Sequence, residues 1–180
     1  MTRSELEHLI RAAGAVAGDR ELVIIGSQSV LGQFPDAPRM LRASMEADLF
    51  PLNHPKRADL IDGAIGEGSR FHETFGVYAQ GVGPRTATLP SGWRGRLIRV
   101  ENANTGGAAG LCLEVHDLAI SKYVAGRQKD LAFTAALARH RMTRRKTLLE
   151  RAAATVLVPA LRRLVEARIA RDFAPARRAR

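Results

Sequence analysis

The stretch Leu22-Val-Ile-Ile-Gly-Ser27, together with Glu46-Ala-Asp-Leu-Phe50 further along, decides the fold predicted for this chain. Four apolar residues that end in Gly-Ser are typical of a short buried strand that turns sharply at its end. The segment Leu41–Phe50 ends in alternating polar and apolar residues, which predicts a second strand. Because residues i and i+2 of a strand share a face, Glu46 and Asp48 should lie side by side.

Two neighbouring carboxylates repel each other and are costly unless a cation or a proton lies between them. Such a pair is typical of a Mg²⁺ site that serves a phosphate-bearing substrate. The pattern therefore predicts a metal site at Glu46 and Asp48, close to the turn at Gly26-Ser27. A short helix predicted over Gln28–Gln33 would direct its N–H groups and the positive end of its dipole at a phosphate.

The other elements of the first 115 residues follow from apolar spacing and from the positions of Gly and Pro. Helices are predicted over Ser4–Ala17, with Ser4 as the cap, and over Pro55–Glu67, and strands over Arg96–Glu101 and Gly110–Val115. Glu101 and Glu114 belong to these last two strands, so both are candidates for a third metal-binding carboxylate.

The stretch from Gly66 to Gly95 is rich in Gly and is predicted to be a loop packed over the edge of the sheet. Glu67, His72 and Glu73 fall in this loop. A histidine beside carboxylates could bind a metal or act as a base, but the spacing matches no standard zinc site. The packed loop is the preferred interpretation.

A helix is predicted to begin at Asp117, and its length has two interpretations. It runs without interruption to Ala138, or Gly126 breaks it and a new helix starts at Arg127. Either way, three cations and one carboxylate are concentrated in nine residues: Lys122, Arg127, Lys129 and Asp130.

The end of the chain is helical in pattern and strongly basic. Thr147–Phe173 predicts a long helix that Pro159 kinks or splits, and the tail from Ala174 is predicted to be disordered. The formal net charge is +10, and residues 139–180 carry 13 Lys and Arg against 3 Asp and Glu, while the first 138 residues balance. A polyanion is the expected partner. The alternative is a solvated basic helix that keeps the protein soluble or that docks on an acidic partner protein.

Length and composition limit the class of protein. A chain of 180 residues with 46% hydrophobic residues suits a single domain with a helical appendage. No apolar run approaches the length of about 20 residues that a membrane helix needs, and no secretory signal opens the chain. The single cysteine, Cys112, cannot form an internal disulfide and is expected to be a small buried hydrophobe. We expect a cytoplasmic protein.

Two groups of residues resemble the nucleotidyltransferase superfamily. Gly26-Ser27 after an apolar strand, with Glu46-x-Asp48 on the next strand, is similar to the Gly-Ser…(Asp/Glu)-x-Asp signature of that superfamily. The block His116–Asp130 resembles the matching block of nucleotidyltransferase-like toxins of the abortive-infection toxin–antitoxin type. An uncharacterised bacterial branch of that group also carries stretches similar to Gly66–Ser69 and Leu89–Trp93. The resemblance covers about residues 22–138.

The basic C-terminal pattern predicts a helical extension, residues 139–180, after a nucleotidyltransferase-like domain, residues 1–138. The resemblance implies an α+β fold for that domain, with a mixed β-sheet flanked by helices. It also implies an enzyme that binds Mg²⁺ and a nucleoside triphosphate. The residues that would hold the triphosphate are Gly26, Ser27, Ser29, Lys122, Arg127 and Lys129, and the catalytic residues would be Glu46, Asp48, Lys122 and Asp130.

The leading hypothesis is therefore a Mg²⁺-dependent nucleotidyltransferase that acts on RNA. Some relatives transfer nucleotides to the acceptor end of tRNA, and the toxin type implies a cognate antitoxin protein. A second hypothesis is a nucleotidyltransferase-like protein that has lost catalysis and binds RNA or a partner protein, because no third carboxylate is unambiguous. A third is a basic DNA-binding protein, although the chain has no clear helix-turn-helix signal.

Overall fold

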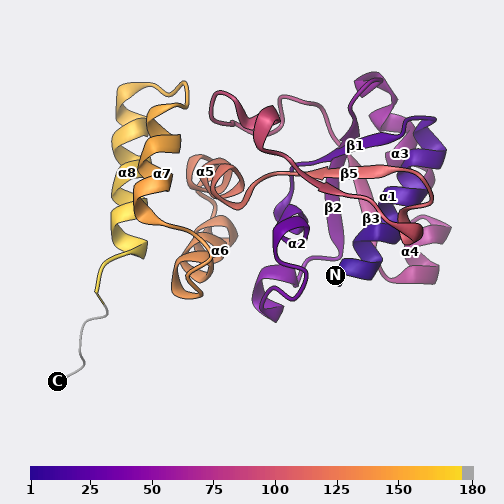
Figure 1. Cartoon of the computed structure of the whole chain (residues 1–180), viewed down its shortest axis with the longest axis horizontal. Helices are drawn as coiled ribbons and strands as arrows, with labels where there is room; N and C mark the ends of the chain where they lie inside the picture. The colour runs from indigo at the N-terminus through magenta and orange to yellow at the C-terminus, as the bar shows by residue number, and fades with distance from the viewer. Residues whose placement is uncertain (176–180) are drawn as a thin grey trace. The chain divides into compact units, whose positions relative to one another are not determined.

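The computed structural model describes residues 1–175, which form two compact units (Figure 1). The first unit comprises residues 1–87 and 92–114, and the second comprises residues 88–91 and the chain from Val115 onward. The predicted division between residues 138 and 139 falls inside the second unit.

The first unit contains one five-stranded sheet with the strand order β3-β2-β1-β5-β4. The strands are β1 (Glu21–Ile24), β2 (Glu46–Pro51), β3 (Tyr78–Gly81), β4 (Ile98–Val100) and β5 (Ala109–Cys112). β1 is parallel to β5 and antiparallel to β2, β3 is parallel to β2, and β4 is antiparallel to β5. The predicted mixed sheet is confirmed.

The helices of the first unit are α1 (Arg3–Ala17), α2 (Val30–Gln33), α3 (Ala58–Ile65) and α4 (Arg70–Phe75). α1 packs against β1, β2 and β5, and α3 packs against β3 (Figure 1). The predicted cap of α1 is wrong by two residues: Thr2 caps the helix and Glu5 completes the capping box. The α+β class, with helices flanking the sheet, is confirmed.

The strand that the apolar run predicts lies at the centre of the sheet. Leu22, Val23 and Ile24 of β1 are fully buried, as expected for a strand with neighbours on both sides. Cys112 on the adjacent β5 is also buried, and burial raises the pKa of its thiol to about 12. The prediction that Cys112 is a buried hydrophobe is confirmed.

Two predictions about the chain between the first strand and residue 95 need correction. The second strand begins at Glu46 rather than Leu41, because Arg39–Arg42 forms a 3₁₀ turn. The segment predicted as a loop contains α4 and the edge strand β3. β3 pairs directly with the strand that carries Glu46 and Asp48, so this omission affects the predicted site.

The second unit is helical: α5 (Val115–Ala125), α6 (Gln128–Arg139), α7 (Arg145–Ala153) and α8 (Pro159–Asp172). Gly126 has φ +66°, which ends α5, so the interpretation with a helix break is confirmed. Pro159 is the first residue of α8, which confirms the predicted split. The predicted disordered tail lies mostly outside the described residues.

Internal hydrogen bonds and ion pairs fasten the helices of the second unit to one another. The buried carboxylate of Asp117 on α5 lies 3.1 Å from the Arg151 guanidinium on α7. The Tyr123 hydroxyl on α5 donates to Asp172 at the end of α8 at 3.0 Å. The Arg168 guanidinium on α8 donates to the carbonyl oxygen of Tyr123. The helices α7 and α8 are therefore part of a packed helical unit.

Within residues 1–175, no helix has both the length and the apolar character needed to cross a membrane.

Candidate functional site

The predicted turn and the predicted carboxylates meet at one end of the sheet, where β1 finishes and β2 begins. The register pairs Ile24 of β1 with Leu49 of β2, and the Ile25 N–H donates to the Asp48 carbonyl oxygen at 3.0 Å. Because β2 runs antiparallel to β1, its first residues lie beside the last residues of β1. Glu46 and Asp48 are half-buried and alternate with the buried Ala47, which confirms that they share a face of the strand.

The Asp48 carboxylate lies directly against the backbone of Gly26. A Cβ atom at position 26 would lie 2.0 Å from Asp48 Oδ2 and 2.8 Å from its Cγ. Real Cβ atoms do not approach so closely, so the contact requires glycine at this position. The Gly-Ser turn and the second carboxylate thus form a single small structure.

The residues after Gly26 hold the turn in place. Ser29 is fully buried, and its hydroxyl donates to the Gly26 carbonyl oxygen at 2.7 Å. Ser29 therefore shapes the turn from behind, and Ser27 is the half-buried serine of the pair. The predicted short helix is a 3₁₀ turn, Ser27–Ser29, followed by the single turn of α2. It is too short to supply the helix dipole expected for a phosphate site.

Gln28 supplies a polar group that the sequence pattern did not predict as part of the site. Its side chain is fully buried, and its Nε2 lies 3.4 Å from the Ser27 hydroxyl. Its Oε1 has no hydrogen-bond partner within the described part of the chain. A buried acceptor beside the turn is thus available to a donor or a cation.

The structure adds Tyr78 of β3 to the site. The parallel register places Tyr78 opposite Glu46 and Gln80 opposite Asp48. Burial raises the pKa of the Tyr78 hydroxyl, and the negative charges of Glu46, Glu67 and Asp48 raise it further. Three carboxylates therefore act on this one hydroxyl, and one of them, Glu67, comes from the segment that was predicted to be a loop.

Neither predicted third carboxylate lies on a strand. Glu114 follows β5 by two residues, at the same edge as Gly26, because β5 is parallel to β1 and pairs Cys112 with Ile24. Glu101 follows β4, which β1 and β5 separate from β2, and it accepts a hydrogen bond from Arg99 at 2.7 Å. Among residues 1–175, no three His, Cys, Asp or Glu side chains come close enough together to hold a metal ion.

The predicted basic cluster forms a compact ion-pair group in the second unit. Asp130 is buried, its Oδ1 lies 3.4 Å from Lys122 Nζ, and its Oδ2 accepts from Arg127 Nε at 2.7 Å. Burial alone would raise the pKa of the Asp130 carboxyl, but the Arg127 hydrogen bond and the Lys122 charge lower it. Lys129 is exposed on the first turn of α6.

The first two residues of the block His116–Asp130 are engaged in packing. His116 Nε2 accepts the Arg144 N–H at 3.0 Å, and the buried Asp117 carboxylate pairs with the Arg151 guanidinium of α7. They join α5 to α7 and to the segment before it.

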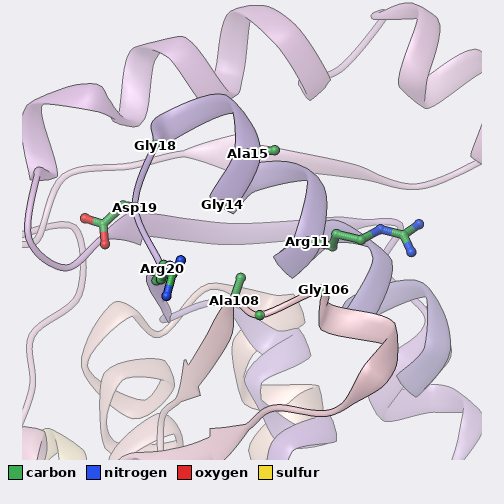
Figure 2. A pocket seen from close by; sticks show the side chains of 9 residues that line it. Arg11, Gly14, Ala15, Gly18, Asp19, Arg20, Gly106 and Ala108 are labelled. Atoms are coloured by element: carbon green, nitrogen blue, oxygen red, sulfur yellow. The ribbon is translucent and has the colours of Figure 1, made fainter.

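A separate cavity of about 500 Å³ lies at the opposite end of the strands, where β1 and β5 begin (Figure 2). It is lined by the end of α1, the residues before β1, and Gly106–Ala108 before β5. Its one carboxylate, Asp19, already accepts N–H groups of Glu21, Asn53 and His54. This cavity therefore contains no part of the predicted site.

The family described as "Nucleotidyltransferase of unknown function (DUF6036)" matches residues 4–148. The chain belongs to this family. No curated protein and no solved structure matches it. The matched residues include the whole first unit except its first three residues, and α5 and α6 of the second. The resemblance that the Gly-Ser turn and the Glu-x-Asp strand indicated is confirmed at the level of the superfamily.

The family is one of nucleotidyltransferases, and phosphoryl-transfer reactions of this kind commonly use a divalent metal. Mg²⁺ prefers oxygen ligands and is commonly held by one or two carboxylates, with water and substrate phosphates completing its shell. Glu46 and Asp48 supply two such carboxylates from one strand, and the Gln28 Oε1 atom is an unpartnered oxygen beside the turn. The donor set fits Mg²⁺ brought in with a triphosphate.

Sequence reasoning missed Tyr78 because it missed β3. The signal was present in Val77-Tyr-Ala-Gln-Gly81, where small or apolar residues alternate with polar ones. Val77 and Ala79 are buried, while Tyr78 and Gln80 are not. The nearby glycines favoured the loop interpretation, because glycine is depleted in strands.

Proposed function

We propose that this chain transfers a nucleotide from a nucleoside triphosphate to an RNA acceptor, in a reaction that depends on Mg²⁺. The observation that carries the proposal is the contact between the Asp48 carboxylate and Gly26, with Glu46 on the same face of β2. Family membership supports the transferase class. The acceptor and the metal dependence are part of the proposal.

In the proposed reaction an RNA hydroxyl oxygen attacks the α-phosphorus of the triphosphate. A new P–O bond forms, the bond to the bridging oxygen of the β-phosphate breaks, pyrophosphate leaves, and the hydroxyl proton passes to water. Bound Mg²⁺ would lower the pKa of the attacking hydroxyl and neutralise charge on the phosphates. The protein mainly needs to align these groups and to balance their charge.

In this proposal, residues of the first unit have three roles: they hold the metal, contact a phosphate and fix the turn. Glu46 and Asp48 would hold the metal, and the half-buried Ser27 would contact a phosphate from the turn. Ser29 fixes that turn through its bond to Gly26, so it acts as a positioning residue. The phosphate-binding roles that the resemblance gives to Lys122, Arg127 and Lys129, and the catalytic role that it gives to Asp130, stay predictions.

An RNA acceptor is supported by basic side chains of the second unit that are exposed to solvent. They include Arg144, Arg145, Lys146 and Arg163. Phosphate contacts from such residues would give affinity without sequence specificity. Other arginines of the same helices serve the fold instead, since Arg151 pairs with Asp117 and Arg162 donates to the Ala152 and Thr155 carbonyl oxygens.

The test is a labelling assay with each nucleoside triphosphate, Mg²⁺ and total RNA that includes tRNA. Wild type should label RNA, and the variant Glu46→Gln/Asp48→Asn should lose at least about 100-fold of that activity, because it removes the charge that holds the metal. Asp36→Asn/Asp59→Asn is the matched control, since it removes two carboxylate charges from exposed residues of the same unit. It should leave labelling unchanged.

The outcomes separate the proposal from its alternative. Labelling that is equal in wild type and in the double variant would contradict the proposed site. Metal-dependent binding of the triphosphate with no transfer to any RNA would instead support a protein that has lost catalysis.

The toxin role, its cognate antitoxin and a cytoplasmic location rest on the sequence alone and stay predictions. Lys122→Met in the same assay tests the contribution of the second unit.

A further inference from the structure

Two aromatic side chains lie beside the candidate metal site and have no part in the function proposed so far. Tyr78 is the first residue of β3 and pairs with Glu46 across the parallel strands. Residues that pair across neighbouring strands project from the same face of the sheet. The half-buried Tyr78 ring is therefore the immediate neighbour of Glu46, on the side of β2 away from β1.

His72 of α4 is held against that ring. The two ring centroids are 4.6 Å apart with an interplanar angle of 52°. The Gly68 N–H donates to His72 Nδ1 at 3.1 Å, and the His72 N–H donates to the Ser69 hydroxyl at 3.2 Å. Because Nδ1 is an acceptor, the neutral ring carries its proton on Nε2, which makes that atom a donor.

Other residues suffice to pack these two elements. α4 is fastened to α1 through Phe71 and Phe75, whose ring centroids lie 5.1 and 4.4 Å from that of His8. β3 is anchored by the buried side chains of Val77 and Ala79. The pair of His72 and Tyr78 is only half-buried, so part of each side chain is presented to solvent.

We propose that Tyr78 and His72 form the nucleoside subsite, which binds the base and ribose of the triphosphate; this rests on the proposed function. The order of the sheet supports it. The Gly26-Ser27 turn after β1 lies on one side of Glu46 and Asp48, and Tyr78 on β3 lies on the other side. A nucleotide with its α-phosphate at the carboxylates and its outer phosphates at Gly26-Ser27 would then place its nucleoside over β3.

The chemistry of the two side chains suits that ligand. An aromatic ring stacks on any base, because every base has a π-face. The Nε2–H of His72 can donate to an acceptor atom of the base or the ribose. Glu67 acts electrostatically on the same tyrosine hydroxyl, and the local negative charge favours a nucleoside, which is uncharged, over a further phosphate.

The test compares two ligands in the presence of Mg²⁺: a nucleoside triphosphate, and inorganic tripolyphosphate, which has neither base nor ribose. Calorimetry with Tyr78→Leu and with His72→Leu should show a loss of about 5- to 100-fold in affinity for the nucleoside triphosphate. Affinity for tripolyphosphate should stay within about twofold of wild type in both variants. Tyr78→Phe keeps the ring and should bind as wild type does.

A second variant separates the subsite from a structural role of α4. Phe75→Ala removes an aromatic ring that lies on the same short helix but contacts His8 instead. It should leave binding of both ligands unchanged. Affinities for both ligands that fall in parallel in Tyr78→Leu would overturn the subsite, because a displaced strand would affect the phosphates as well.

The wild-type protein distinguishes failure of this inference from failure of the proposed function. If wild type binds the nucleoside triphosphate no more tightly than tripolyphosphate, the subsite is wrong and the phosphate site stands. If it binds neither ligand, the proposed function fails, and the subsite that rests on it fails with it.

Discussion

At the scale of single residues, Gly26 offers the sharpest test of the site. A methyl group at this position would overlap Asp48 Oδ2, at 2.0 Å from the added Cβ. Gly26→Ala should therefore displace the carboxylate and lower Mg²⁺-dependent nucleotide affinity by about tenfold or more, with the helical content kept. Calorimetry with the triphosphate and Mg²⁺ measures the affinity, and circular dichroism checks the fold.

Gly63→Ala is the matched control for that substitution. Gly63 lies in α3, and an added Cβ there meets no atom within 4 Å. Alanine favours helix more than glycine, so Gly63→Ala should leave binding unchanged and stabilise the fold by about 0.5–1 kcal/mol. Equal nucleotide affinities in the two variants would show that the Asp48 contact is not needed.

The charge around Tyr78 gives a second prediction, which needs no ligand. Removing a carboxylate charge with Glu46→Gln or Glu67→Gln should lower the pKa of Tyr78 toward the ordinary value of about 10. Absorbance of tyrosinate, followed as pH rises from about 9 to about 12, measures this pKa, and Tyr78→Phe identifies its transition. An unchanged transition in both variants would contradict the effect of Glu46 and Glu67 on the Tyr78 hydroxyl.

The sign of the linked stability effect follows from the raised pKa. The folded state holds the Tyr78 proton more tightly than the unfolded state does. This contribution to folding is therefore fully present below about pH 10 and is lost as pH rises through the raised pKa. Neutralising Glu46 or Glu67 should reduce that alkaline loss, because it brings the two pKa values together.

At the scale of the elements, the Asp130 group links the end of α5 to the start of α6. Asp130→Asn leaves the Lys122 ammonium, whose side chain is 13% exposed, without its charge partner. We expect a loss of about 3 kcal/mol in the free energy of unfolding, at the low end for buried pairs because Arg127 is exposed. Chemical denaturation measures it, and Lys129→Gln on the exposed side of α6 should change stability by less than about 0.5 kcal/mol.

The pH dependence of that stability gives a second test of the role of Asp130. The pKa of Asp130 is lowered in the folded state, so its contribution is present above about pH 4 and is lost as pH falls below that value. Asp130→Asn should remove this acid-sensitive part of the stability. A variant as stable as wild type at neutral pH would show that Asp130 has no structural role.

Elements with strong local signals were predictable from the sequence. β1 is predictable from a run of consecutive apolar residues, the break at Gly126 from the positive φ that glycine tolerates, and the start of α8 from the fixed φ of Pro159. β3 has four residues and lies at the sheet edge among glycines, so its alternation is short and half-exposed. Its pairing with β2 stabilises it, and that pairing is not visible in its own sequence.

At the scale of the whole molecule, the strand order could not be predicted from the sequence, because the local pattern of a strand does not show which strand it pairs with. β1 pairs with β5, and Leu22 faces Gly110 across 87 intervening residues. No local pattern encodes such a partner. The carboxylate pair was predictable, since two residues of one strand fix their own spacing, whereas the approach of Asp48 to Gly26 depends on the register of β1 with β2.

The charge distribution of the whole chain carries the last prediction. Arg145, Lys146 and Arg163 of the second unit are exposed. Changing all three to Gln should weaken RNA binding and make the plot of log affinity against log salt less steep by about 2–3, since each phosphate contact releases counterions. The control changes Arg39, Lys56 and Arg85 of the first unit, which are also exposed, and removes the same net charge. Filter binding over a salt series measures both. An equal change in slope for the two variants would mean that RNA responds to net charge alone, and the second unit would then not be the RNA-binding surface.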